Sequence, residues 1–317
     1  IETMEKVRVG LWGVGRAGWT MHKKEVARFS DMLDERDIDL VDIATCSTDH
    51  VKHALMSLER GRWTLLESPM ALTLDDAQLL RGAATKAKNR LLVLQRGLFA
   101  PDFLLAKTMM ADSRLGEIYQ ICLRREDFIR RDDWQTVKRL GGGAAYYAMT
   151  DLILQALKIL PQPPIQMWSE LKRIASLGDA EDYAHVNLKT RTQISADIEF
   201  NGGALTANKS PSFVIRGDRG VFSVNADSPV GTLTVVDPDY KFSRRRSSVR
   251  TPSLADMHED IPLVTSEVSL PKGTLHGPSA FWKSVYDTVR TAAAFPIQLE
   301  DSIEAVKFAH LMKKTSP

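Results

Sequence analysis

A glycine-rich turn directly after the first strand-like segment constrains this chain more than any other feature. Residues 7–12 form a short apolar run, and Gly13, Gly15 and Gly18 follow it before a helix-compatible stretch begins. In this spacing the first glycine permits a tight turn, the second lets the backbone approach a diphosphate, and the third lets helix pack on strand. The phosphates would bind free N–H groups at the start of that helix. We therefore predict a dinucleotide-binding turn, with a purely structural turn as the alternative.

Apolar runs and helical spacings alternate after this turn. The expected strands and helices, in chain order, are residues 30–36 (helix), 40–45 (strand), 49–60 (helix), 63–66 (strand), 74–89 (helix) and 91–95 (strand). Strands that alternate with helices of these lengths form a parallel sheet with helices on both faces. The sequence therefore predicts an α/β fold whose residues 1–97 form a doubly wound, Rossmann-type domain.

The pattern changes beyond Pro101, where strand-like segments of alternating polarity follow one another. Helices are expected at 102–112, 147–160, 278–292 and 300–314, a strand at 118–125, and strand-like segments from Gln166 to about Val236, which include 185–189, 195–200, 204–207, 213–216 and 220–224. Glycine-containing turns between the short strands favour antiparallel pairing. Residues 98–317 are therefore predicted to form a second α/β domain, an antiparallel sheet with helices on one face; the family resemblance described below implies that this sheet is large and open, and that the domain binds substrate and mediates oligomerisation.

One expected strand is missing from the first domain. A dinucleotide-binding fold has a strand ending in Asp or Glu about 20 residues after the glycines, yet the stretch from Gly18 to Leu40 has room only for a helix. Either a strand–helix unit is deleted, or a segment is absent from the sequence between about Lys24 and Ala27. We favour the second reading, because losing an inner strand would split a parallel sheet. The choice between NAD and NADP cannot be made without this strand.

Composition excludes several classes of partner. The net charge of +2, from 42 basic and 40 acidic residues, does not indicate a basic surface that binds nucleic acid or a membrane. Cys46 and Cys122 are the only cysteines and have no zinc or disulfide spacing. No apolar run approaches the roughly 18 residues of a membrane span, and no signal-peptide region precedes the first strand. We expect a cytoplasmic protein with small-molecule or protein partners.

Several stretches, in the same order, resemble the glucose–fructose oxidoreductase, inositol dehydrogenase and rhizopine-catabolism (Gfo/Idh/MocA) family. The stretches are residues 9–18, 42–55, 65–73, 130–147 and 294–310, and the likeness covers nearly the whole chain. The resemblance implies a Rossmann domain followed by an open-sheet domain, and hydride transfer between NAD or NADP and a sugar or cyclitol hydroxyl or ketone. It also implies a homodimer or homotetramer formed through the open sheet, whose apolar face would otherwise be exposed.

The resemblance also assigns residues to the cofactor. Pyrophosphate would lie on the glycine turn, and the nicotinamide half beside the turns that follow later strands. Cys46 stands where the family usually has proline, and a proline preceded by a cis peptide is common at Pro69. The cofactor-binding residues implied are Gly13, Gly15, Arg16, Ala17, Gly18, Thr45, Cys46, Ser47, His50, Glu67, Pro69 and Gln95.

The catalytic positions depart from the family pattern. Ser68 stands where the family has a lysine, whose ammonium group would lower the pKa of a substrate hydroxyl. Tyr147, Asp151 and Leu154 stand where the family has Asp or Asn, then His, then Asp. Asp151 could replace the histidine as a base if burial raises its pKa, with Tyr147 as hydrogen-bond donor. The alternative is that Asp151 pairs locally and Tyr147 packs against the sheet.

Two further groups of polar residues have weaker assignments. Arg130, Arg131 and Trp134 could hold a polyhydroxylated or anionic substrate through hydrogen bonds and ring stacking, or could belong to a solvated loop. His50 and His53 lie three residues apart without a third ligand nearby, so no metal site is predicted.

Two classes of function remain from the sequence. The first is an oxidoreductase of the Gfo/Idh/MocA type with impaired or altered acid–base residues, which we favour because the nicotinamide itself carries the hydride. The second is a non-catalytic regulator on the same fold that binds a dinucleotide or a sugar, and Ser68 and Asp151 favour it. A third reading is that the substitutions and the gap were engineered.

Overall fold

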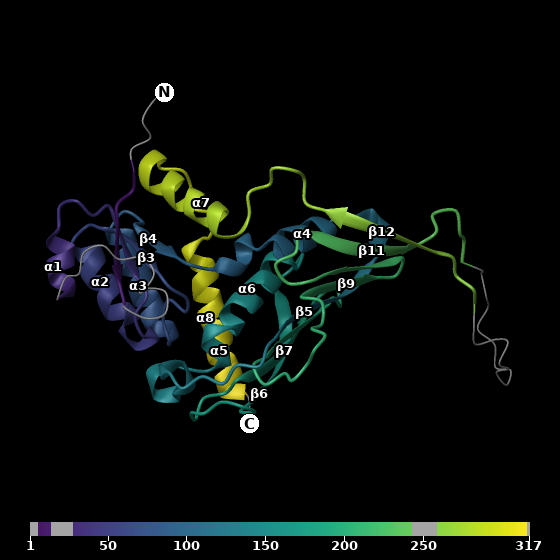
Figure 1. The fold of residues 1–317 in the computed structure, drawn as a ribbon, viewed down its shortest axis with the longest axis horizontal. Helices are drawn as coiled ribbons and strands as arrows, with labels where there is room; N and C mark the ends of the chain where they lie inside the picture. Colours follow the sequence, from purple (N-terminus) through teal and green to yellow (C-terminus); the bar gives the residue numbers. More distant parts are fainter. Residues whose placement is uncertain (1–5, 14–27, 243–258, 316–317) are drawn as a thin grey trace.

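The computed structural model describes residues 6–13, 28–242 and 259–315, which form two sheets with helices between and around them (Figure 1). The first sheet has the order β1-β2-β3-β4, and every pair of neighbours is parallel. Its strands are β1 (Val9–Trp12), β2 (Leu40–Ile43), β3 (Trp63–Leu66) and β4 (Leu91–Val93). The Rossmann-type parallel sheet predicted for the first domain is confirmed.

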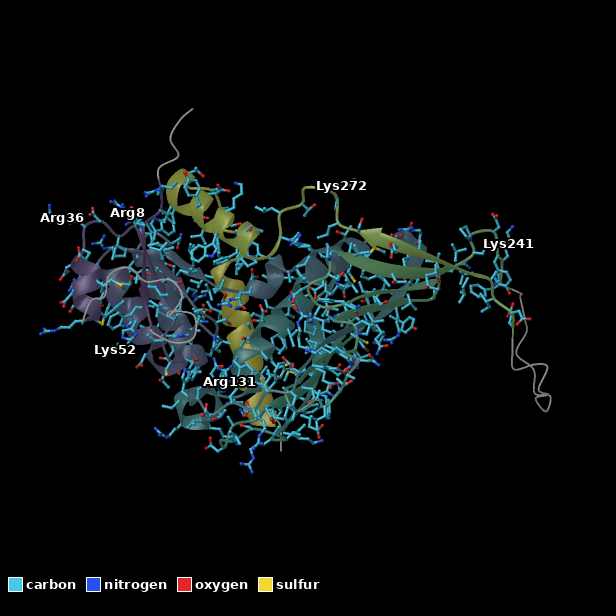
Figure 2. All side chains as sticks on the ribbon, viewed as in Figure 1. Arg8, Arg36, Lys52, Arg131, Lys241 and Lys272 are labelled. Carbon is cyan, nitrogen blue, oxygen red and sulfur yellow. The ribbon has the colours of Figure 1, made fainter. Side chains whose placement is uncertain are left out.

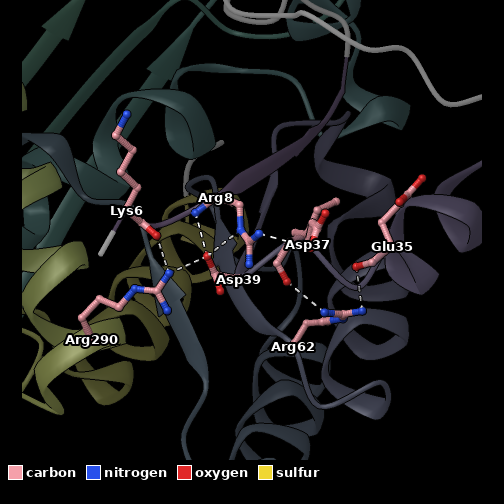
Figure 3. Close-up of polar contacts among 8 residues, drawn as sticks. Lys6, Arg8, Glu35, Asp37, Asp39, Arg62 and Arg290 are labelled. Atoms are coloured by element: carbon pink, nitrogen blue, oxygen red, sulfur yellow. Dashed lines mark hydrogen bonds and ion pairs between the residues drawn. The ribbon is translucent and has the colours of Figure 1, made fainter. Parts of the chain in front are cut away.

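Three helices cover one face of this sheet, because each has an apolar face that packs on β2, β3 and β4. They are α1 (Phe29–Asp34), α2 (His50–Glu59) and α3 (Leu74–Lys86). Helix α3 begins where expected, because the Thr73 side chain accepts a hydrogen bond from the Asp76 backbone N–H. The Arg62 guanidinium donates to the carbonyls of Leu33 and Glu35, which satisfies the C-terminal end of α1 (Figure 3).

The other face is covered by α7 (Gly277–Thr291), which comes from the far end of the chain (Figure 1). Its Phe281 ring packs against Phe99 with 5.5 Å between ring centroids, in a cluster with Leu40, Leu65 and Leu92. An ion pair holds the helix end, since Arg290 Nη2 lies 2.6 Å from Asp39 Oδ2 (Figure 3). Long-range packing therefore adds a C-terminal helix to the first sheet.

The second sheet has eight strands in the order β12-β11-β10-β9-β5-β8-β7-β6. All neighbours are antiparallel except β5 and β8, which are parallel. The large, mostly antiparallel sheet is therefore confirmed. Its strands are β5 (Ile118–Glu126), β6 (Pro164–Lys172), β7 (Tyr183–Thr190), β8 (Ser195–Asn201), β9 (Phe213–Gly217), β10 (Gly220–Val224), β11 (Val230–Val236) and β12 (Leu263–Ser269).

Helices pack on the inner face of the second sheet, where alternate side chains of β7 and β8 such as Val186 and Ile198 are buried. The helices are α4 (Pro101–Met109), α5 (Ala144–Tyr147) and α6 (Met149–Ile159), and α8 (Leu299–Thr315) runs between the two sheets (Figure 1). Single 3₁₀ turns connect these elements, namely η2 (Ser47–Asp49), η3 (Arg96–Phe99), η4 (Ser113–Leu115), η5 (Trp134–Thr136) and η6 (Lys138–Leu140). The boundary at residue 97 thus falls within η3.

The open face of the second sheet carries a cluster of ion pairs as well as exposed apolar side chains. Asp197 lies 2.5 Å from His185 Nε2 and 2.9 Å from Arg124 Nη2, and Arg124 also approaches Glu199. Trp168, which is 53% exposed, packs its ring edge-on against His185. The homodimer or homotetramer through this sheet stays a prediction.

Two expectations about strands need correction. Residues 204–207 do not form a strand: β8 ends at Asn201, Gly203 makes an isolated bridge with Phe128, and the Leu205 side chain is 84% exposed. β12 lies outside the strand-like region expected from Gln166 to about Val236 and was not predicted; it forms one edge of the sheet, and β6 forms the other. An edge strand buries less of each of its faces than a central strand, so apolar and polar residues alternate less clearly along its sequence.

The missing strand of the first domain does not interrupt the sheet. β1 pairs directly with β2, with Gly10 opposite Val41, and β1 is the edge strand of the described residues. The argument that a deletion would split the sheet is therefore wrong, because the lost strand would lie outside β1. Within the described parts of the chain, no helix is long and apolar enough to cross a membrane.

The packing of α7 predicts that Phe281→Ala lowers the free energy of unfolding by about 3–5 kcal/mol, because the buried ring leaves a cavity against Phe99. Chemical denaturation followed by circular dichroism measures the loss. The control Leu79→Ala, at a side chain that is 52% exposed on α3, should change it by less than about 0.5 kcal/mol. Equal effects of the two substitutions would contradict the packing of α7 on the first sheet.

Candidate functional site

One cavity lies at the carboxyl ends of the four parallel strands, and a second lies beside it over the second sheet. The first has a volume of about 480 Å³ and is lined by Asp42 of β2, by Leu94 just after β4 and by Phe281 of α7. The second, of about 670 Å³, is lined by residues of the second sheet and by Tyr147. Asp151, Arg125 and Asp227 line both. Ligands of open parallel sheets bind at this edge, so the cavities are the candidate site.

Asp42 places a carboxylate in the first cavity from within β2. Its Oδ1 atom is buried and has no hydrogen-bond partner among the described residues. Burial, together with the nearby Glu67 carboxylate, raises the pKa of Asp42 to about 7, and the Arg96 guanidinium partly opposes this rise. A buried acceptor without a partner is costly unless a ligand supplies a donor.

Glu67 follows β3 and lines the same cavity. Its Oε1 atom lies 2.8 Å from Nη2 of Arg96, whose own side chain is largely exposed. Burial raises the pKa of Glu67, and the nearby Arg96 guanidinium limits the rise. The first cavity is thus lined by Asp42 and Glu67 at the strand ends in addition to Asp151 and Asp227, and both of its guanidinium groups, those of Arg96 and Arg125, are paired with carboxylates.

His50 joins the two turns that the family resemblance assigned to the cofactor. Its Nδ1 lies 2.8 Å from the Pro69 carbonyl oxygen and its Nε2 lies 3.2 Å from that of Thr45. Burial lowers the pKa of His50, which favours the neutral ring, and a neutral ring donates to only one of these oxygens. The Ser68–Pro69 peptide bond is cis, as the resemblance implied. His50 thus holds the turns at residues 45–47 and 67–69 together.

Ser68 points toward helix α6 rather than into either cavity. Its Oγ lies 3.2 Å from Oγ1 of Thr150, and the Thr150 hydroxyl donates to the Tyr146 carbonyl oxygen at 2.7 Å. Because that hydroxyl has one hydrogen, Ser68 is the donor to Thr150. Ser68 lines neither of the two cavities.

Asp151 lies on α6 where the two cavities meet. The Gly97 backbone N–H donates to both carboxylate oxygens, at 3.2 and 3.1 Å. Burial raises the pKa of Asp151 to about 6, while the Gly97 hydrogen bond, Arg125 and Arg96 oppose the rise. The carboxylate is therefore poised to gain or lose a proton near neutral pH.

Tyr147 lines the second cavity and also packs against the sheet. Its ring lies edge-on to Phe200 with 5.4 Å between centroids. Burial raises the pKa of the Tyr147 hydroxyl, so the group stays protonated and can donate a hydrogen bond. Both readings of Tyr147 from the sequence are compatible with this position.

The three residues considered for substrate binding lie outside both cavities. Arg131 pairs with Asp133, with 2.9 Å from Nε to Oδ2, at the surface (Figure 2). Trp134 begins η5, and neither it nor Arg130 lines either cavity. Arg131 lies close enough to Tyr147 to lower the pKa of that hydroxyl slightly. The structure therefore does not bring these side chains together with Asp151.

Only part of the glycine turn can be described. Gly13 has a φ of +124°, and a Cβ atom there would lie 2.4 Å from the Ala44 carbonyl oxygen, so the close approach of β1 and β2 requires glycine. Gly15, Arg16, Ala17 and Gly18 lie outside the described residues. Gln95, at the end of β4, is buried, and its Oε1 has no partner in the described chain.

Several residues of the site were missed by the sequence analysis. Arg96 and Gly97 stand in the turn after β4, and Arg125, Asp227 and Trp282 come from distant segments. For Asp42 a signal exists, because it is a charged residue inside an otherwise apolar strand. No local pattern marks the others, since tertiary packing alone brings them to the cavity. In the described chain no group of three or more His, Cys, Asp or Glu could hold a metal ion.

Two family models match this chain. Residues 7–95 match the oxidoreductase family with an NAD-binding Rossmann fold, and residues 103–223 match the GFO/IDH/MocA C-terminal domain. The chain therefore belongs to the Gfo/Idh/MocA family of NAD-binding oxidoreductases.

Individual relatives are distant. The chain is 25% identical to the oxidoreductase YdgJ of Escherichia coli, over 69% of this chain and 71% of that protein. It is 20% identical to scyllo-inositol 2-dehydrogenase (NADP(+)) IolW of Bacillus subtilis, over 92% of this chain and 80% of that protein. The solved structure of an NAD-binding protein from Listeria innocua superposes with a TM-score of 0.76 at 20% identity, covering 92% of this chain and 84% of that one. This last likeness shows the shared fold.

The position of Asp42 predicts how stability depends on pH. Its pKa in the folded protein is about 7, above the ordinary value of 3.8, so folding takes up a proton between these values. The free energy of unfolding therefore falls as pH rises through that window. The Asp42→Asn variant has no carboxylate to titrate at this position, so its stability does not fall in this way. Above a pH of about 8 its free energy of unfolding should exceed that of the natural chain by about 2–4 kcal/mol.

Urea denaturation at a series of pH values measures the advantage. Asp132→Asn, at an exposed site, is the matched control and should show no such growth. An advantage of Asp42→Asn that stays constant from about pH 4 to about pH 8 would contradict the buried, unpartnered carboxylate.

Proposed function

We propose that this protein is an NAD(P)-dependent oxidoreductase that transfers a hydride between nicotinamide and a hydroxyl or ketone of a sugar or cyclitol. The observation that carries the proposal is the position of Asp151, which lines both the cavity at the strand ends and the cavity over the second sheet. Oxidation of an alcohol needs a base that accepts the hydroxyl proton, and Asp151 lies between the cavity proposed for the cofactor and the cavity proposed for the substrate. The printed activity of the relative IolW, a cyclitol dehydrogenase, supports the substrate class.

The residues around the first cavity fit a nicotinamide cofactor. The turn that begins at Gly13 would hold the diphosphate, and Asp42 and Glu67 would accept hydrogen bonds from hydroxyl groups of the ribose. Leu94 and Phe281 provide an apolar wall for a ring. When bound, the cofactor supplies the hydride acceptor or donor of the reaction. Asp42 Oδ1, buried without a partner, is the observation that calls for such donors.

Asp151 would act as the general base during oxidation and as the acid during reduction. With a pKa of about 6 its carboxylate is mostly ionised at neutral pH and can accept the proton of a substrate hydroxyl. Tyr147, which also lines the second cavity, would donate a hydrogen bond to a substrate oxygen. The Gly97 N–H keeps the Asp151 carboxylate at the boundary between the cavities.

Ser68 makes the proposed enzyme slow. Its hydroxyl is occupied with Thr150 and offers no positive charge to a developing alkoxide. Lys209 lines the second cavity, but its amine lies 3.4 Å from Asp127 and is held by that carboxylate. We therefore propose that the step relies on Asp151 without the family's lysine, at a cost of about 10²–10⁴ in rate.

A non-catalytic regulator that binds a dinucleotide or a sugar is the second candidate. The direction of Ser68, toward Thr150 and out of both cavities, favours it. Both candidates need the cofactor cavity, and they differ in whether Asp151 acts on a substrate. For either, we propose a homodimer or homotetramer through the outer face of the second sheet, where Arg124, Asp197 and His185 form ion pairs.

Oxidation of a panel of sugars and cyclitols with NAD and NADP tests the enzyme directly. We expect kcat/KM to rise as pH rises through about 6, because Asp151 must lose its proton before it can accept one. Asp151→Asn should lower kcat by about 10²–10⁴, while Asp239→Asn, at an exposed loop site, should leave it unchanged. Turnover that survives in Asp151→Asn would show that another group is the base.

The double substitution Ser68→Lys with Asp151→His separates the two candidates. In a slow enzyme it should raise kcat by about 10²-fold or more, because it restores the family's lysine, with the positive charge that Ser68 lacks, together with the histidine that serves as its partner in the family. Absorbance of the reduced nicotinamide measures the rate. A variant that still binds the cofactor, but oxidises none of the panel, would favour the regulator.

A further inference from the structure

Helix α6 places two side chains on one face, toward the turn η3 between the sheets. Asp151 and Gln155 are four residues apart, and residues at this spacing lie one above the other on a helix. Asp151 accepts from the Gly97 N–H, and Gln155 Nε2 donates to the Gly97 carbonyl oxygen at 2.7 Å. The two side chains therefore hold both backbone polar groups of one residue.

Gly97 fits this arrangement only because it lacks a side chain. A Cβ atom there would lie 2.4 Å from Asp151 Oδ2 and 2.4 Å from Gln155 Nε2. Glycine is required here because helix α6 comes so close, and not because of the backbone conformation, since the φ of Gly97 is not positive. Helix α6 and the turn are thus in direct contact across the boundary between the two sheets.

Gln155 makes no contact with either cavity and so cannot touch a ligand there. It is fully buried, and its Oε1 atom has no partner among the described residues. Its amide hydrogen bond anchors the Gly97 carbonyl, which also accepts from the Ala100 N–H at 3.2 Å. The Gly97 carbonyl belongs to the peptide after Gly97 and its N–H to the peptide before, so Gln155 and Asp151 hold the two peptide planes on either side of this residue.

We propose that Gln155 is a positioning residue, which holds the Gly97 backbone so that its N–H stays on the Asp151 carboxylate and sets the pH at which Asp151 takes up a proton. The inference rests on the proposed function, because Asp151 matters to chemistry only if it exchanges a proton with a substrate. A hydrogen bond to the ionised form lowers a carboxyl pKa, so loss of this N–H raises it. The charged groups that also face Asp151 are Arg125, Arg96 and Asp102.

The test is a carbon-13 titration of the Asp carboxyl groups, with the Asp151 signal assigned by its absence in Asp151→Asn. Gln155→Met keeps the volume of the side chain and removes the unpartnered oxygen together with the donor, so the fold should persist. The expected midpoint for Asp151 is about 6 in the natural chain and about one unit higher in Gln155→Met. The matched control is Gln298→Met, whose amide donates to the Phe295 carbonyl and makes no hydrogen bond to Gly97 or Asp151, and it should leave the midpoint unchanged.

Gly97→Ala is the second variant, because its methyl group displaces the Asp151 carboxylate from the N–H, and it should raise the midpoint as well. It replaces Gln155→Met as the deciding measurement if that variant does not fold. An unchanged Asp151 midpoint in the folded variant would overturn the inference. The titration uses neither cofactor nor substrate, so its result is independent of whether the protein turns over any sugar.

Discussion

The contact between helix α6 and the backbone of Gly97 joins the two sheets at the point where the chemistry would occur. Gly97 follows the last strand of the first sheet, and α6 packs on the second, so this contact connects the two sheets beside the cavities. It also places Asp151 on the boundary between them. Helix α7 closes the other side of the first cavity with Phe281, which ties the cavity to the C-terminal part of the chain.

Much of the fold was predictable because its buried strands are continuous apolar runs. β2, β3 and β4 are covered on both faces, so their sequences hold few polar residues, and the helices between them keep a helical period. β12 escaped prediction because it is an edge strand whose side chains are largely exposed. Residues 204–207 were wrongly predicted as a strand, because this short apolar run lies exposed beyond the end of β8.

The site was predictable only where local sequence carries the chemistry. Gly13 and Asp151 could be found from the glycine spacing and from the family pattern around residues 141–154. Gly97, Gln155 and Phe281 could not, because their roles depend on contacts between segments far apart in the chain. The arginines near residue 130 attracted attention by their charge, yet Arg131 is satisfied by Asp133 in its own loop. The cluster of charged residues near position 130 was therefore a poorer guide to the site than the residues that follow the predicted strands.

The central claim is that the strand ends of the first sheet, with the turn that begins at Gly13, form a dinucleotide site. Calorimetric titration of the protein with NAD, NADH, NADP and NADPH tests this most directly. The account predicts saturable binding of at least one of the four at a concentration below about 1 mM. The absence of heat and of saturation with all four at that concentration would contradict the cofactor site, and with it the assignment of Asp151 to hydride-transfer chemistry.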